Sequence, residues 1–206
     1  TTIDTEKAGM WSNGSFLFSG VALTGEPLHN KVGDYQWSNN IDSYGVDTLQ
    51  LYEAWYEHSF MDGRASLLVG LHDYMSDFYY LEYAIPFIQS SFSYGPELSQ
   101  NTNSTYPVTS LAARLRFEPT ENTYINVAAF DGIPGSPNNY GRTTVSLSKK
   151  DGVFYAGEIG ITSKEEDAET DYFKIALGGW YQTTNYTDWG DRNRSDNGGG
   201  YIIGER

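Results

Sequence analysis

The chain has 206 residues, enough for one domain with a sizeable core, and its 27 acidic and 13 basic residues give a formal net charge of -14. This charge argues against nucleic acid as a partner, because the phosphates would repel the protein, and the absence of cysteine excludes disulfides and cysteine metal sites. No run approaches the roughly 18 apolar residues of a transmembrane helix, which excludes a helical membrane protein. A membrane β-barrel is not excluded, because its strands alternate apolar and polar residues and contain no long apolar run.

The N-terminal part contains one predicted strand and one predicted loop. The first residues, TTIDTEKAGMW, lack the basic and apolar pattern of a secretory signal. We therefore expect that a signal has been removed or that the chain starts inside a longer protein. Met10–Leu23 is predicted as a strand with Phe16, Phe18 and Ala22 on one face. The polar segment Thr24–Gly45, rich in Gly, Asn and Asp, is predicted as a loop.

The next two strands, Val46–His58 and Arg64–Asp73, are predicted to form a hairpin. Between them lies Asp62-Gly63, a dipeptide that favours the positive φ angles of a tight turn. Counting outward from this turn sets the register. The pairs that follow are Glu57 with Leu68, Tyr56 with Val69, and Ala54 with Leu71.

Side chains alternate along a strand, so the two faces of this hairpin differ in chemistry. The apolar face, with tyrosine among the aliphatic residues, carries Tyr52, Ala54, Tyr56, Leu67, Val69 and Leu71. The charged face carries Glu53, Trp55, Glu57, Arg64, Ser66 and His72. A soluble sandwich would bury the apolar face against another sheet, and a membrane barrel would turn it to lipid.

Further strands are predicted from the same alternation. They are Ser110–Glu118, Tyr124–Asp131, Val153–Thr162 and Tyr172–Thr183, and Gly200–Arg206 begins another. The alternation is strictest in the first of them, which places Leu111, Ala113, Leu115 and Phe117 on one face. Strands of about 8–13 residues suit a tilted span of a membrane.

The connections between these strands alternate in length. The short ones are Asp62-Gly63, Pro119–Thr123 and Ser163–Thr170, and the long ones are Thr24–Gly45, Tyr74–Thr109, Gly132–Asp151 and Asn185–Gly199. Short turns on one rim and long loops on the other are typical of outer-membrane barrels. The sequence therefore predicts an all-β fold, an antiparallel transmembrane β-barrel of the outer-membrane type.

Between Leu49 and Arg206 the chain contains, in order, LYEAWYEHSF, DGRASLLVGLHD, SSFSYGPELSQ, AAFDGIPG, DGVFYAGEIG and RSDNGGGYIIGER. Together these segments resemble the carbohydrate-selective porins of the OprB type, whereas Thr1–Asp47 is less distinctive. The resemblance implies a barrel of about 16 strands in the outer membrane of a Gram-negative bacterium. It also implies passive diffusion of small sugars and polyols, and loops folded inward to narrow the pore. Because only about eight strands are predicted here, we expect a fragment of such a barrel.

In a barrel, the charged faces of these strands would line a wet lumen. The residues predicted to line it are Glu53, Trp55, Glu57, Arg64, His72, Arg114, Arg116, Glu158, Lys174 and Trp180. Charged groups can exchange hydrogen bonds with sugar hydroxyls, and aromatic rings offer flat faces to pyranose rings. Equally, the charges can pair with one another and shape the wall without touching a sugar. Arg114 and Arg116 are the strongest candidates for sugar contact, because they form a ladder of donors on one face.

The long segment Tyr74–Thr109 is rich in aromatic residues, unlike a simple surface loop. Its apolar side chains need burial, and a loop of this length in a compact domain is usually functional. We expect it to fold into the barrel mouth, with Tyr79, Tyr80, Glu82 and Tyr83 at the constriction. Alternatively, the stretch FYYLEYAIPFI forms another strand pair or packs on itself.

No catalytic group, metal site or cofactor is predicted. Glu53 and Glu57 lie about 13 Å apart along one strand, whereas paired glycosidase carboxylates need roughly 5–9.5 Å, so another strand would have to supply a partner. The segment DRNRSDNGGG matches a calcium loop only at Asp191 and Asn193. The three histidines are not clustered.

The expected partners are small carbohydrates in transit and outer-membrane lipid, without nucleic acid, and no pattern indicates an oligomeric state. The main alternative is a secreted soluble β-sandwich that binds carbohydrate. A third possibility is an eight-stranded outer-membrane barrel that serves as an enzyme or adhesin. Membrane and soluble folds differ in whether Leu111, Leu115 and Ile175 face lipid or an enclosed core.

Overall fold

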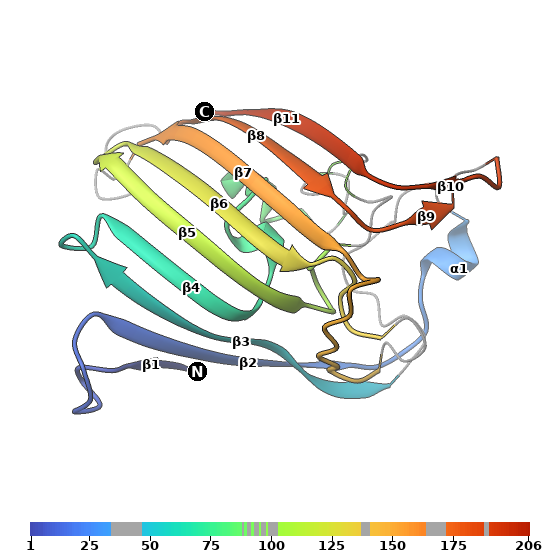
Figure 1. Cartoon of the computed structure of the whole chain (residues 1–206), viewed down its shortest axis with the longest axis horizontal. Coiled ribbons are helices and arrows are strands. Elements are labelled where there is room, and N and C mark those ends of the chain that lie inside the picture. The colour runs from blue at the N-terminus through green and yellow to red at the C-terminus, as the bar shows by residue number, and fades with distance from the viewer. Residues whose placement is uncertain are drawn as a thin grey trace.

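The computed structural model describes residues 1–33, 47–87, 89, 92, 95, 98, 103–136, 141–163, 172–187 and 190–206. Within these residues the chain forms one nine-stranded antiparallel sheet in the order β1-β2-β3-β4-β5-β6-β7-β8-β11 (Figure 1). A small hairpin, β9-β10, lies in the connection before the last strand. Each long strand thus pairs with its neighbours along the chain, as in an up-and-down barrel wall.

The strands of the sheet are β1 Thr2–Asp4, β2 Gly14–Leu23, β3 Thr48–Phe60, β4 Ala65–His72, β5 Ser110–Thr120, β6 Thr123–Asp131, β7 Val153–Thr162, β8 Lys174–Gln182 and β11 Asn197–Glu205. The small hairpin consists of β9 Tyr186–Thr187 and β10 Asn193–Arg194, and the short helices are α1 His29–Val32, η1 Tyr74–Ser76 and η2 Glu82–Ala84. Among the described residues, no helix has the length and apolar character needed to cross a membrane.

The predicted strands are present, with small differences at their ends. The predicted strand Met10–Leu23 begins only at Gly14, because the preceding residues form a turn. In this turn the Thr5 hydroxyl accepts from the Gly14 amide and lies within hydrogen-bond distance of the Trp11 and Gly14 carbonyls. The last strand starts at Asn197, before the predicted Gly200.

The connections lie at the two ends of the sheet as their lengths predict. Those after β3, β5 and β7 share one end, and those after β2, β4, β6 and β8 share the other, because consecutive strands run antiparallel. The predicted turn Ser163–Thr170, apart from its first residue, and most of the loop Thr24–Gly45 lie outside the described residues.

The predicted register of the β3-β4 hairpin is confirmed: Ala54 pairs with Leu71 and Glu57 with Leu68. The turn, however, is wider than two residues, because the last paired positions are Phe60 and Ala65. Positive φ begins at Met61, with 54°, before the predicted Asp62-Gly63. A methionine rarely adopts a positive φ, so the residue type at position 61 gave no indication of this wider turn.

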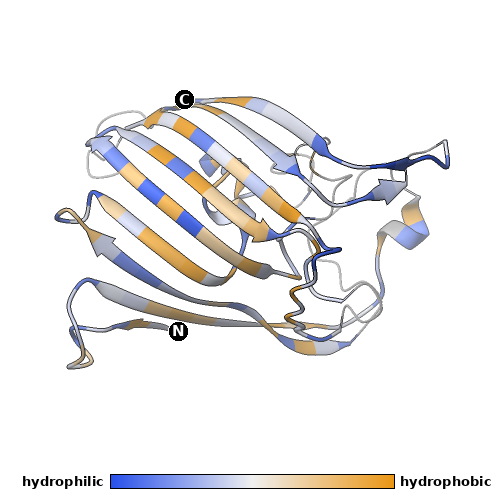
Figure 2. Cartoon of the chain, in the orientation of Figure 1, coloured by the Kyte–Doolittle hydropathy of each residue, from blue (hydrophilic) through white to orange (hydrophobic). Residues whose placement is uncertain are grey.

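Outward and inward side chains alternate across the sheet. Figure 2 shows this as alternating hydrophobic and hydrophilic bands on β5, β6 and β7. Leu115, Val127, Ile159, Ile175 and Leu177 on one face, called here the outer face, are each 46–60% exposed. A soluble sandwich would enclose these side chains; here they form an open apolar surface.

The opposite, inner face contains the main core. Side chains from β5 to β8 pack there against residues that follow β4. The buried cluster consists of Tyr74, Phe78, Leu98, Ala112, Ala128, Phe130, Phe154, Ala156 and Trp180. Tyr74 and Phe78 of the aromatic loop are therefore buried against the inner face of the sheet, whereas Tyr80, Tyr83 and Phe87 are 37–49% exposed.

One end of β3 extends beyond β4, which pairs only with Ala54–Phe60. Two loops cover backbone groups there: the Thr109 hydroxyl donates to the Tyr52 carbonyl, and the Thr143 hydroxyl donates to the Leu51 carbonyl. Threonine hydroxyls from the long loops thus replace the missing ladder partners, which keeps this strand edge from being left unsatisfied.

Candidate functional site

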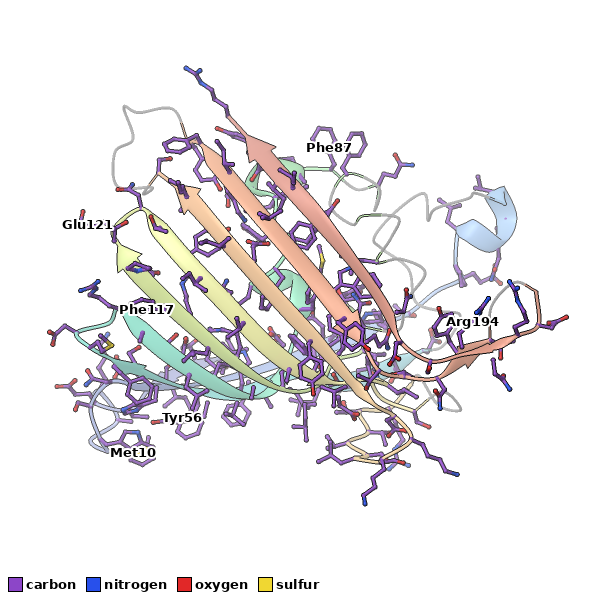
Figure 3. The ribbon with its side chains drawn as sticks, turned by 45° about the horizontal axis from the view of Figure 1, so that its top comes forward. Met10, Tyr56, Phe87, Phe117, Glu121 and Arg194 are labelled. Carbon is purple, nitrogen blue, oxygen red and sulfur yellow. The ribbon has the colours of Figure 1, made fainter. Side chains whose placement is uncertain are left out.

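The candidate site is the inner face together with residues 73–87, called here the inner segment. The segment leaves β4, runs behind β6 and β7 in Figure 1 through η1 and η2, and reaches the end of β11, where the Tyr83 amide donates to Glu205 Oε1 at 3.0 Å. In Figure 3 its last residue, Phe87, is labelled beside the β11 edge of the sheet, and Tyr56 is labelled near the other edge. Residues 73–87 contain no strand, so the alternative in which FYYLEYAIPFI forms a further strand pair is not realised in this part of the chain.

The first attachment point of the inner segment is Asp77. Its Oδ2 lies 2.6 Å from His72 Nε2 and accepts a hydrogen bond from Arg114 Nε at 2.9 Å. Its backbone carbonyl accepts from Asn126 Nδ2 at 2.9 Å. Three neighbouring strands, β4, β5 and β6, therefore hold one loop residue. Burial alone would raise the pKa of Asp77, but the hydrogen bond to His72 and the charge of Arg114 outweigh it and lower this pKa, so the carboxylate is charged at neutral pH.

His72 lies between two carboxylates, since its Nδ1 is 3.1 Å from Glu53 Oε1. A doubly protonated imidazole ring satisfies both contacts with its two N–H groups. The indole of Trp55 packs edge-on against this ring, with centroids 6.3 Å apart. Asp73, the first residue of the inner segment, has a raised pKa because it is buried.

Arg114 is 5% exposed and binds groups on three sides. Besides Asp77, it donates from Nη1 to Ser66 Oγ at 2.7 Å and from Nη2 to Glu57 Oε1 at 2.9 Å. Three of the five N–H donors that were expected to serve sugar hydroxyls are thus engaged within the protein. Arg116 differs: its Nε donates to Glu118 Oε1 at 2.9 Å, its guanidinium lies over the Tyr124 ring, and a third of its side chain is exposed.

The second attachment point is Glu158 on β7, whose side chain is fully buried. Its Oε1 accepts from the Tyr124 hydroxyl at 2.5 Å, and its Oε2 accepts from the Tyr201 hydroxyl at 2.6 Å. Oε2 also accepts from the Tyr79 amide at 3.0 Å. Lys174 Nζ lies 3.7 Å from Oε1 and balances the buried charge.

Two glycines give the tyrosine rings their place beside Glu158. Tyr124 pairs across strands with Gly160, and Tyr201 pairs with Gly178. A Cβ at either glycine would overlap the paired tyrosine ring. The rings can therefore lie flat on the inner face and direct their hydroxyls from β6 and β11 to the same carboxylate.

The structure thus gathers most of the predicted lining residues into these two attachment points. Glu53, Glu57, His72 and Arg114 surround the first, with Trp55 beside them, and Glu158 and Lys174 form the second. Trp180 instead belongs to the buried aromatic cluster, stacked on Phe154 at 5.7 Å. Arg64 lies in the exposed β3-β4 turn and donates to the carbonyls of Glu118 and Pro119.

The four residues expected at the constriction all lie in the inner segment. Tyr79 has a positive φ of 56°, and its ring packs against Tyr201 at 4.7 Å. The Tyr80 carbonyl accepts from Lys174 Nζ at 2.8 Å, and its side chain leaves the residue 37% exposed. Glu82 begins η2, and Tyr83 is 49% exposed with its ring against Tyr172.

Sequence reasoning missed several residues of the two attachment points. Tyr124, Asn126 and Tyr201 occupy inward positions in the strand alternation, which was the available signal. Asp77 lies outside any periodic pattern. In the part of the chain that the structure describes, no cluster of three histidine, aspartate or glutamate side chains could hold a metal ion.

Comparisons with known proteins agree with this architecture. The family described as carbohydrate-selective porin, OprB family, matches residues 1–201. A solved structure of OprB from Pseudomonas putida, at high pH, matches with a TM-score of 0.76 and 18% sequence identity, covering 98% of this chain and 52% of that one. The chain thus spans about half the length of that porin. A search of the curated proteins found no match. The chain belongs to the carbohydrate-selective porins of the OprB family.

Proposed function

We propose that this chain forms part of the wall of an outer-membrane pore through which small sugars and polyols diffuse passively. The observation that carries the proposal is the inner segment, which is bound to the inner face while the outer face remains apolar and exposed. A wall of this kind suits lipid on one side and a narrowed polar passage on the other.

We assign the sugar contacts to the inner segment rather than to the arginine ladder. Arg114 is committed to Asp77, Ser66 and Glu57, whereas Tyr80 and Tyr83 keep exposed rings. A phenol ring offers a flat apolar face to a pyranose and a hydroxyl to its edge. Such contacts are weak, with about 0.5–1.5 kcal/mol net for each hydrogen bond, and weak contacts suit transport because a tight site would trap the sugar.

The test is the ion current through single channels of the full-length barrel in planar bilayers. We expect an added monosaccharide to reduce the current, because a sugar on the inner segment occupies the narrow part of the passage. The double variant Tyr80→Ala/Tyr83→Ala should weaken this block. The matched control is Tyr186→Ala, an exposed tyrosine in β9 outside the inner segment. A wild-type current indifferent to any sugar would refute the proposed function.

The proposed location predicts which end of the sheet faces the outside of the cell. The chain contains no cysteine, so single cysteines can be introduced as reporters. Lys149 lies in the long β6-β7 connection and Asn122 in the β5-β6 turn, at opposite ends of the sheet. A membrane-impermeant thiol reagent added to intact cells should label Lys149→Cys and spare Asn122→Cys. Equal labelling of the two variants would contradict the outer-membrane topology.

A further inference from the structure

Glu158 and Lys174 bind the backbone of the inner segment, and Lys174 Nζ also lies 5.8 Å from the centroid of the Tyr80 ring. Glu158 Oε2 accepts from the amide of Tyr79, and Lys174 Nζ donates to the carbonyl of Tyr80. The two contacts are 3.0 and 2.8 Å long, and they join an acidic and a basic wall residue to the N–H and C=O of successive residues. Such charge-assisted hydrogen bonds are about twice as strong as neutral ones.

The wall supplies every other component of this arrangement. Glu158 comes from β7, Lys174 from β8, Tyr124 from β6 and Tyr201 from β11, so the acceptor and the donor are in place without help from the segment. The two side chains are 0% and 7% exposed, which leaves no surface for a passing sugar. The buried polar groups of the two side chains are satisfied by contacts to the segment, to each other and, for Glu158, to the Tyr124 and Tyr201 hydroxyls.

The backbone that they hold has an unfavourable conformation. Tyr79 adopts a φ of 56°, in the left-handed region that residues other than glycine rarely occupy. Such a conformation persists only where the surroundings enforce it. The hydrogen bond to the Tyr79 amide is a contact that does so.

We propose that Glu158 and Lys174 are positioning residues that clamp the Tyr79–Tyr80 backbone to the wall and thereby set the width of the passage. This inference rests on the proposed function, because it assumes that the inner segment narrows a pore. With this clamp in place, Tyr80 and Tyr83 are 37% and 49% exposed, so the permeating molecule can reach part of each side chain.

The experiment measures docking of the segment and width of the passage separately, in the full-length barrel. Ala84 is buried in η2, so the variant Ala84→Cys provides the single, buried thiol of these 206 residues, and any cysteine elsewhere in the full-length barrel is replaced by serine. In this background we compare Glu158→Gln, Lys174→Met and the milder Tyr201→Phe. Each removes a charge or a charge-assisted hydrogen bond, which should raise the undocked fraction, and with it the rate of thiol modification, about tenfold or more.

The width is measured as single-channel conductance and as the smallest poly(ethylene glycol) that the channel excludes. Glu158→Gln and Lys174→Met should give a larger conductance and exclude only larger polymers. The control Tyr155→Phe alters a tyrosine on the outer face of the same strand β7, and it should change neither reading.

Barrel folding is checked by the temperature at which the variant loses its folded mobility in gel electrophoresis. Folded Glu158→Gln, Lys174→Met and Tyr201→Phe barrels with wild-type thiol rates and polymer exclusion would overturn the clamp. If Glu158→Gln fails to fold, the thiol modification rates and polymer exclusion of Tyr201→Phe and Lys174→Met test the clamp in its place. Because polymer exclusion does not depend on sugar, a channel that ignores sugars but widens in Glu158→Gln would refute the proposed function and keep the clamp.

Discussion

Replacing Arg114 with alanine should destabilise the folded barrel by about 3–5 kcal/mol, the usual cost of removing one partner from a buried ion pair. The guanidinium is 5% exposed and binds both Asp77 and Glu57. Without it, the buried carboxylate of Asp77 keeps only His72 as a charged partner. The measurement is urea unfolding of the barrel reconstituted in lipid vesicles.

The matched control for this prediction is Arg116→Leu, two residues further along β5. Its ion pair with Glu118 is one-third exposed, and pairs of this kind contribute about 0–1 kcal/mol. If Arg114→Ala and Arg116→Leu lose the same stability, the two arginines are equivalent and Arg114 does not anchor the inner segment. If Arg114→Ala has the stability of the wild type but no longer shows a current block by sugar, Arg114 contacts the sugar and does not anchor the inner segment.

Replacing Leu115 with arginine should obstruct assembly of the barrel in a membrane. Leu115 lies between the two arginines, but its side chain points to the outer face and leaves the residue 47% exposed. An arginine on the lipid face costs about 2–4 kcal/mol near the bilayer midplane. The measurement is the yield of folded barrel in vesicles, with Arg116→Leu as the inward control. Equal yields of folded barrel for the two variants would contradict the assignment of the Leu115 face of β5 to the lipid.

The sequence by itself determined the strands and their faces. The alternation in Ser110–Glu118 places Leu115 outward and Arg114 inward, and the structure has both so. The register of the β3-β4 hairpin followed from Asp62-Gly63 and is confirmed at Ala54 and Leu71. These features are local: the side-chain period of a strand and the φ preference of a turn depend on residues only a few positions apart.

Only the tertiary structure decided which groups the inward charges meet. Arg114 binds Asp77, 37 residues earlier in the chain. The Glu158 carboxylate accepts hydrogen bonds from the hydroxyls of Tyr124 and Tyr201, which lie on strands to either side of β7. These partners depend on the course of a loop without a periodic pattern and on glycines that make room for rings from neighbouring strands. An alternating pattern predicts that a side chain points inward. The energy of a buried charge, however, depends on the atoms within a few ångströms of it. Those atoms come from distant parts of the chain, so only the tertiary structure brings them together.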